Sequence, residues 1–114
     1  MKIIAFLFII FSLGSTLFAQ QKDIVVVVDA GHGGNDPGHL SGNVKSLPEK
    51  DLNLKISNLV GGYIEQYLQH VRVIYTRNDD RYVSLNDRVE KANNAGADYF
   101  ISIHCNGNER TSVH

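Results

Sequence analysis

Apolar and polar positions along the chain predict three strands separated by two helices. Residues 23–30, DIVVVVDA, are almost continuously apolar and β-branched, which is typical of a strand buried on both faces of a parallel sheet. Residues 71–77, VRVIYTR, alternate well enough for a second strand, and residues 98–107, DYFISIHCNG, contain a third. Strands joined through a crossover helix run parallel. The pattern therefore predicts an α/β fold with a mostly parallel sheet and flanking helices.

The first predicted helix begins at Asp51 and continues to about Gln69, because apolar residues recur there at steps of three and four. Its predicted apolar face consists of Leu52, Ile56, Leu59, Val60, Tyr63, Ile64 and Tyr67. Gly61 and Gly62 lie inside this helix, although a helical glycine costs about 1 kcal/mol relative to alanine. We interpret both glycines as points of close contact with the sheet.

The second predicted helix lies between Ser84 and Gly96. Ser84 can cap its N-terminus together with Asp87, and Gly96 is typical of a C-terminal stop. Three strands and two helices are expected to leave sheet edges and apolar faces uncovered, which predicts poor solubility or partial folding.

The N-terminal stretch has the features of a secretory signal peptide. One lysine precedes an apolar run over residues 3–11, and a small residue, Ala19, stands where cleavage is expected. A membrane span needs about 20 apolar residues, and this run is about half as long. We therefore assign residues 1–19 to a signal peptide and expect an exported chain, periplasmic or alternatively extracellular, with no stable membrane insertion after cleavage.

The composition of the remaining residues limits the function classes. About 95 residues are enough for one small domain. A net charge of −1 argues against a nucleic-acid partner, which would require a basic face. Cys105 is the single cysteine, so no internal disulfide can form. The glycines of residues 31–34 do not follow dinucleotide or P-loop spacing, which excludes a nucleotide site.

Two histidines follow strands that are expected to be neighbours. His32 comes after the first strand and His104 after the third, so parallel strands place both at one edge of the sheet. With a strand order of 2-1-3, the two strands are also neighbours. Glu49 precedes the first helix, in a loop that returns to the same edge. Two histidines and a glutamate are a ligand set for catalytic zinc, with a fourth position left for water. The alternative to a zinc site is that each histidine is only a hydrogen-bonded loop residue. Glu49 would then be a negative charge that stabilises the helix N-terminus.

Five other residues are weaker candidates. Asp29 and Asp36 either hydrogen-bond a ligand histidine or structure the loop. His39 is expected to be solvated, and His70 to have a structural role after the first helix. Cys105 is expected to point away from His104 and to be a small core residue rather than a further ligand.

Three segments carry a resemblance to a known family. The stretches VVVDAGHGGNDPG, PEKDLNL and YTRNDDRYVSLNDRVEKANNAGADYFISIHCNG resemble the N-terminal two thirds of zinc-dependent N-acetylmuramoyl-L-alanine amidases of the Amidase_3 type. The resemblance implies an exported enzyme that cleaves the amide between N-acetylmuramic acid and L-alanine in peptidoglycan. It also implies that His32, Glu49 and His104 are the zinc ligands.

The chain departs from the family pattern at its C-terminal end. Members continue with a further strand, helices and a second glutamate that acts as general base, so this glutamate is expected beyond His114. Glu109 is only five residues past His104 and is not assigned that role. Residues 20–114 are thus expected to be the N-terminal part of the catalytic domain. The alternatives are a degenerate, non-catalytic module that binds zinc or peptidoglycan, and an exported zinc hydrolase with another amide substrate.

Overall fold

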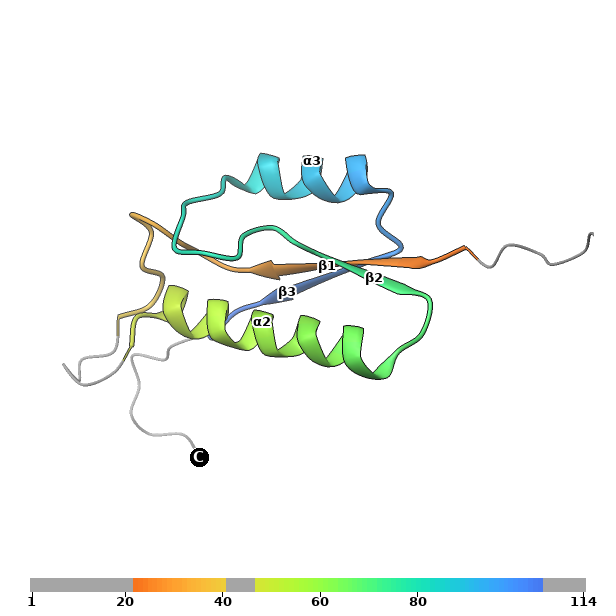
Figure 1. Cartoon of the computed structure of the whole chain (residues 1–114). Helices are drawn as coiled ribbons and strands as arrows, with labels where there is room; N and C mark the ends of the chain where they lie inside the picture. Colours follow the sequence, from red (N-terminus) through yellow and green to blue (C-terminus); the bar gives the residue numbers. More distant parts are fainter. Residues whose placement is uncertain (1–21, 41–46, 106–114) are drawn as a thin grey trace, which may run out of the picture.

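The computed structural model describes residues 22–40 and 47–105, which form a helix, a sheet and a second helix in three layers (Figure 1). The elements, in chain order, are β1 (Ile24–Ala30), α2 (Glu49–Tyr67), β2 (Val71–Tyr75), α3 (Leu85–Ala95) and β3 (Tyr99–Ile103). The predicted fold class and order of elements are confirmed. The signal peptide assigned to residues 1–19 lies outside the described residues.

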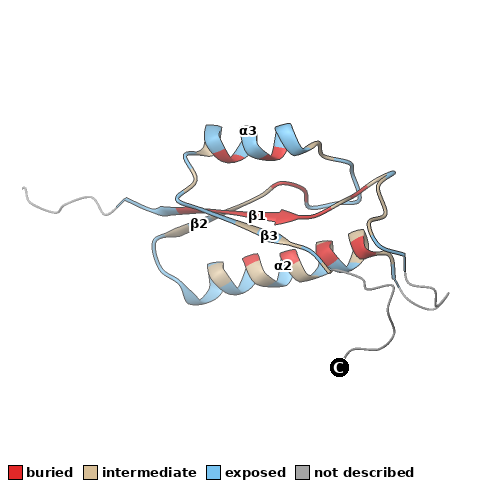
Figure 2. Ribbon diagram, turned by 180° about the vertical axis from the view of Figure 1, so that it is seen from behind, coloured by how far each residue is buried: buried red, intermediate tan, exposed pale blue. Residues whose placement is uncertain are grey.

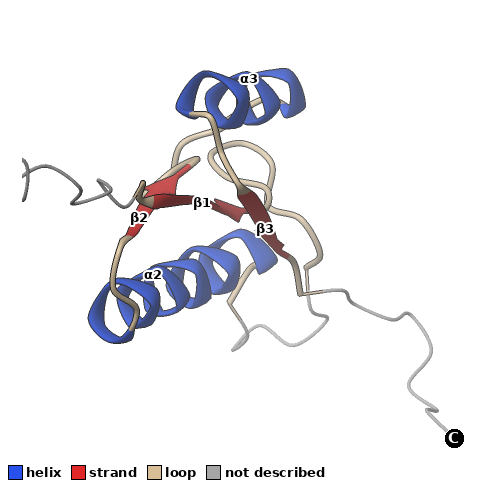
Figure 3. Ribbon diagram, turned by 90° about the vertical axis from the view of Figure 1, so that its right-hand side faces the viewer, coloured by secondary structure: helices blue, strands red, loops and turns tan. Residues whose placement is uncertain are grey.

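The sheet has the topology that brings the two histidines together. Its strands are parallel and lie in the order β2-β1-β3, with α2 on one face and α3 on the other (Figure 3). The central strand is buried from Val25 to Ala30 (Figure 2), which confirms burial on both faces. Ala30 pairs with Ile103, so the residues after β1 and β3, including His32 and His104, leave the sheet side by side.

The buried side of α2 coincides only in part with the apolar face that the sequence predicts, of which Ile56, Val60 and Ile64 are half-buried. Large side chains of that predicted face are 39–70% exposed: Leu52, Leu59, Tyr63 and Tyr67. The helix instead buries short or polar residues at every fourth position: Glu49, Asn53, Ser57 and Gly61. Such residues let the helix backbone lie close to the sheet, while the larger apolar residues project from its flank. Uncovered apolar surface, as predicted, is therefore present in the described part of the chain.

The two glycines of α2 have different surroundings. A Cβ on Gly61 would overlap the phenol of Tyr75 on β2, so the predicted close contact is confirmed there. A Cβ on Gly62 would meet no atom within 4 Å, so the same prediction is wrong for Gly62. Gly62 lies on the open side of the helix, where alanine has the higher helix propensity.

Gly62→Ala is expected to stabilise the chain by up to about 1 kcal/mol, because it removes the entropic cost of a helical glycine. Gly61→Ala is expected to destabilise it by about 1–3 kcal/mol, because the added methyl group overpacks against Tyr75. Urea unfolding of both variants measures the difference, and each variant serves as the control for the other. Equal effects of the two substitutions would contradict the close contact at Gly61.

Helix α3 has the ends that the sequence predicts. The Asp87 backbone N–H donates to Ser84 Oγ at 3.1 Å, and Gly96 ends the helix in the left-handed conformation, with φ 61°. Its buried residues are Arg88 and Ala92. Within residues 22–40 and 47–105, no helix combines the length and apolar character needed to cross a membrane.

Candidate metal centre

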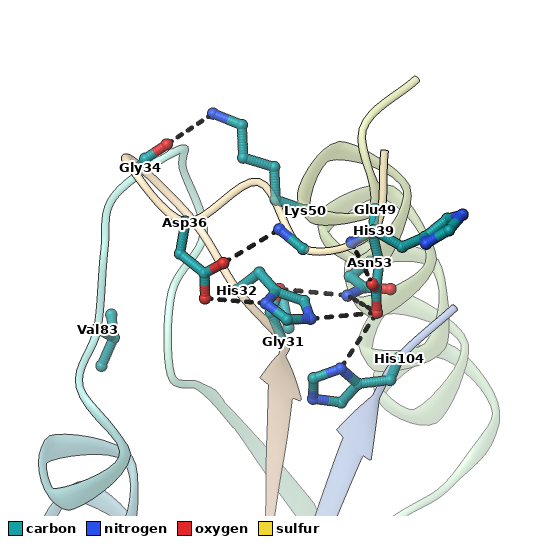
Figure 4. A network of polar contacts seen from close by, with 12 residues as sticks. Gly31, His32, Gly34, Asp36, His39, Glu49, Lys50, Asn53, Val83 and His104 are labelled. Atoms are coloured by element: carbon teal, nitrogen blue, oxygen red, sulfur yellow. Dashed lines mark hydrogen bonds and ion pairs between the residues drawn. The ribbon is translucent and has the colours of Figure 1, made fainter. Parts of the chain in front are cut away.

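Three side chains that could hold a metal ion converge at the carboxyl edge of the sheet (Figure 4). His32 follows β1, Glu49 begins α2 and His104 follows β3. Glu49 Oε1 lies 3.3 Å from His32 Nε2 and 3.2 Å from His104 Nδ1. One donor atom from each residue lies within 4.8 Å of the other two. The structure therefore brings together the three residues that the sequence singles out as a ligand set.

Glu49 is held as a buried, ionised carboxylate. It is 6% exposed. Burial raises the pKa of Glu49, but hydrogen bonds to the ionised form outweigh this effect and lower the pKa to about 2. The donors are the backbone N–H groups of His39 at 2.8 Å and Cys105 at 3.1 Å, and the side chains of Asn53 and His104. At neutral pH the site therefore contains a carboxylate with two imidazole nitrogens close to it.

Protonation of Glu49 is expected to destabilise the metal-free chain. Its pKa is about 2 in the folded state against a usual value of 4.5, so the ionised group contributes stability above pH 4.5. This contribution, about 3 kcal/mol at about 1.4 kcal/mol per pH unit, is lost as the pH falls from 4.5 toward 2. Urea unfolding across this pH range measures the loss. In the Glu49→Gln variant, the free energy of unfolding should depend less on pH over this range than in the parent chain. Equal pH dependence of the two proteins would contradict the low pKa of Glu49.

His32 is oriented by a carboxylate on its far side. Its Nδ1 lies 2.9 Å from Asp36 Oδ2, and the backbone N–H of Gly38 donates to Asp36 Oδ1 at 3.1 Å. The hydrogen bonds from His32 and Gly38 lower the pKa of Asp36. The ionised Asp36 favours the His32 tautomer in which Nδ1–H donates to its carboxylate, which leaves Nε2 without a proton on the side that faces Glu49. The predicted contact between Asp36 and a candidate ligand histidine is confirmed.

Asp29 does not contact either histidine, so that alternative is wrong for it. It accepts hydrogen bonds from Thr76 Oγ1 at 2.6 Å, Ser102 Oγ at 2.7 Å and Arg88 Nη1 at 2.6 Å. The register explains this placement, because Asp29 pairs with Ser102 and both side chains lie on the α3 face of the sheet. Glu49 approaches from the opposite face, at the start of α2.

Two glycines make room for the donor side chains themselves. A Cβ on Gly31 would overlap the His104 ring. A Cβ on Gly38 would lie 2.6 Å from His32 Cδ2 and 2.8 Å from Glu49 Oε2. Gly31 and Gly38 therefore allow close packing of the two histidines and the glutamate.

The remaining candidates lie outside the donor cluster. His39 is exposed, as expected, and contacts Glu49 only through its backbone: its N–H donates to Glu49 Oε2 at 2.8 Å, and its carbonyl accepts the Glu49 N–H at 3.1 Å. His70 is exposed and its carbonyl accepts the N–H of Ile24, consistent with a structural role. Cys105 is half-buried rather than a core residue, and it is not part of the three-residue donor cluster.

An open cleft of about 640 Å³ begins at the two histidines and extends between α3 and β3. His32, His104 and Asp36 form its polar end, and the wall along α3 and β3 contains Val89 and Phe100. The donor cluster thus opens onto this cleft through its two histidines.

Comparison with known proteins decides the family. Residues 26–114 match the Amidase_3 family, described as N-acetylmuramoyl-L-alanine amidase. The chain belongs to this family. It is 45% identical over 83 residues to the sporulation-specific N-acetylmuramoyl-L-alanine amidase of Bacillus subtilis (strain 168). The matched region covers 73% of this chain and 31% of that protein.

Solved structures of amidases share the fold of this Amidase_3 chain. The catalytic domain of CwlV, an N-acetylmuramoyl-L-alanine amidase from Bacillus (Paenibacillus) polymyxa var. colistinus, superposes with a TM-score of 0.73 and 37% identity, over 79% of this chain and 49% of that one. The N-acetylmuramoyl-L-alanine amidase from Clostridium difficile 630 superposes with a TM-score of 0.74 and 37% identity, over 82% of this chain and 50% of that one. The chain thus spans about a third of the curated relative and about half of each structure.

The sequence of this Amidase_3 chain did not predict a role for two arginines whose side chains contact the backbone next to the donor cluster. Arg77 and Arg88 are 2% and 5% exposed, and both donate hydrogen bonds to the backbone that leads into His32. The available signal was weak: Arg77 ends a predicted strand, and Arg88 follows Ser84 by four residues on a helix.

Proposed function

We propose that the protein is a zinc-dependent N-acetylmuramoyl-L-alanine amidase and that His32, Glu49 and His104 are its zinc ligands. The observation that carries the proposal is the convergence of two imidazoles and an ionised carboxylate on one point beside an open cleft. Two histidines and one glutamate are the ligand set of several catalytic zinc sites, in which a fourth position stays open. When bound there, zinc would polarise the scissile amide carbonyl and activate a water molecule for attack.

The chain's own residues prepare this site without the metal. Asp36 fixes the orientation of the His32 ring, and the backbone N–H groups of His39 and Cys105 fix Glu49. The low pKa of Glu49, about 2, keeps its side chain ionised at neutral pH, so no proton has to leave this ligand when zinc binds there. The donor chemistry, two imidazoles and a carboxylate within 4.8 Å of one another, fits zinc.

The proposed substrate is peptidoglycan, bound in the cleft between α3 and β3 with its lactyl–alanine amide next to the donor cluster. The general base is the second glutamate that the family resemblance implies beyond His114, and no described residue is given this role. We further propose that residues 1–19 are a signal peptide and that the protein acts in the periplasm.

The test is cleavage of purified peptidoglycan by the native protein and by the mature form of the 114-residue sequence, each with and without zinc. The proposal predicts release of stem peptides with a free L-alanine amino group, detected by mass spectrometry, and no release by the His104→Ala variant. Loss of a general acid/base costs about 10²- to 10⁴-fold, so a form without that glutamate should cleave at most slowly. Zinc-dependent binding to peptidoglycan without cleavage by the native protein would favour the non-catalytic module.

A further inference from the structure

His32 has a backbone conformation that needs support. Its φ is 60°, in the left-handed region that residues with a Cβ adopt uncommonly. A strained residue of this kind persists only where the surrounding structure holds it. The ring of His32 is half-buried and is held at Nδ1 by Asp36, whose side chain is 45% exposed. The support for the backbone must come from the other side of the loop.

Two buried guanidinium groups supply this support. Arg77 donates from Nε to the carbonyl of Ala30 and from Nη2 to that of Gly31, both at 2.9 Å. Arg88 donates from Nη1 to the carbonyl of Ala30 at 2.7 Å and from Nη2 to that of His32 at 2.8 Å. Three consecutive carbonyls at the end of β1, including that of the strained residue, therefore accept hydrogen bonds from the two side chains.

The same arginines connect this segment with the other two donors. Arg77 Nη2 also donates to the carbonyl of Lys50, the residue after Glu49, at 2.8 Å. Arg88 pairs with Asp29, which accepts from Ser102 Oγ on β3, two residues before His104. The network thus reaches all three segments that carry the donor cluster, although neither arginine belongs to the cluster itself.

We propose that Arg77 and Arg88 are positioning residues that hold His32 and Glu49 in their metal-binding arrangement before the metal binds. The inference rests on the proposed function, because it takes the donor cluster to be a zinc site. Each guanidinium contacts several carbonyls at once through its planar fork, which a lysine ammonium cannot reproduce from the same position. A conservative Arg→Lys change keeps the positive charge and removes the fork.

The experiment measures the zinc affinity of the full chain and of the Arg88→Lys and Arg77→Lys variants by competition with a chromophoric chelator. Loss of an outer partner of a metal site costs about 10–100-fold in affinity, and we expect a loss in this range for each variant. Replacement of zinc by Co²⁺ provides an independent readout, because a displaced His32 should alter the visible absorption of the bound cobalt.

Two controls separate positioning from general stability. Val27→Ala removes fully buried apolar volume from β1 and should lower the urea midpoint while leaving zinc affinity unchanged. Arg72→Lys, on an exposed position of β2, should change neither quantity. Zinc affinities of both arginine variants equal to that of Val27→Ala would overturn the inference.

The remaining outcomes are also decisive. If Arg88→Lys does not fold, Arg77→Lys alone carries the test; if neither folds with or without zinc, the arginines act on the whole fold and the inference is wrong. A parent chain that binds no zinc would overturn the proposed function itself, whereas zinc binding by the parent with unchanged affinity in the variants would overturn only the positioning role.

Discussion

Replacing His32 or His104 by alanine is expected to abolish zinc retention by the chain. Each substitution removes one of three donors that lie within 4.8 Å of one another, and the two remaining donors cannot enclose the ion. Loss of an outer partner already costs about 10–100-fold in affinity, so loss of a ligand is expected to exceed about 100-fold. Metal analysis of the purified variants after dialysis against a weak chelator measures the effect.

His39→Ala is the matched control for these two variants. His39 belongs to the same loop as His32, but its side chain is exposed, and it contacts Glu49 only through its backbone N–H and carbonyl, which alanine retains. Its zinc content should equal that of the parent chain. Unchanged metal content in both His32→Ala and His104→Ala would show that the ligand assignment is wrong.

Asp29→Asn is expected to destabilise the fold by about 3–5 kcal/mol, because it leaves a buried arginine without its carboxylate. The side chains of Asp29 and Arg88 are 5% and 6% exposed and lie 2.6 Å apart. Burial raises the pKa of Asp29, but hydrogen bonds from Thr76, Arg88 and Ser102 lower it overall, so the group is ionised in the folded chain. Urea unfolding at neutral pH measures the loss.

Asp79→Asn is the control variant, because it removes the carboxylate of an exposed ion pair instead of a buried one. Asp79 pairs with Arg81, but the two side chains are 55% and 61% exposed, and exposed pairs contribute little to stability. Its unfolding midpoint should lie close to that of the parent chain. An Asp29→Asn variant as stable as Asp79→Asn would contradict the role of the buried pair.

Much of the fold follows from local signals. The β-branched run of β1 identifies a central strand, and Ser84 and Gly96 mark the ends of α3 through their own side-chain and backbone chemistry. The donor cluster could also be predicted, because parallel topology alone places the ends of β1 and β3 at one edge. Glu49 is brought to the same edge because it is the first residue of α2, directly after the loop that follows β1.

The predictions that were wrong or missing concern tertiary contacts, which the spacing of apolar residues does not predict. The apolar side chains of α2 suggest one face, yet Asn53 and Ser57 are fully buried, because close helix–sheet approach favours short side chains. Gly61 and Gly62 are neighbours in sequence but point in directions about 100° apart on the helix, so only Gly61 meets Tyr75. The roles of Arg77 and Arg88 depend on which carbonyls lie beneath the loop, which the sequence does not specify.

The central claim is that His32, Glu49 and His104 bind one zinc ion. It is tested most directly by anomalous diffraction at the zinc edge from crystals of the zinc-loaded chain. We expect one strong peak at about 2.0–2.2 Å from a nitrogen of each histidine and an oxygen of Glu49. A zinc peak elsewhere with none at these three residues, or no bound zinc in the loaded protein, would contradict the account.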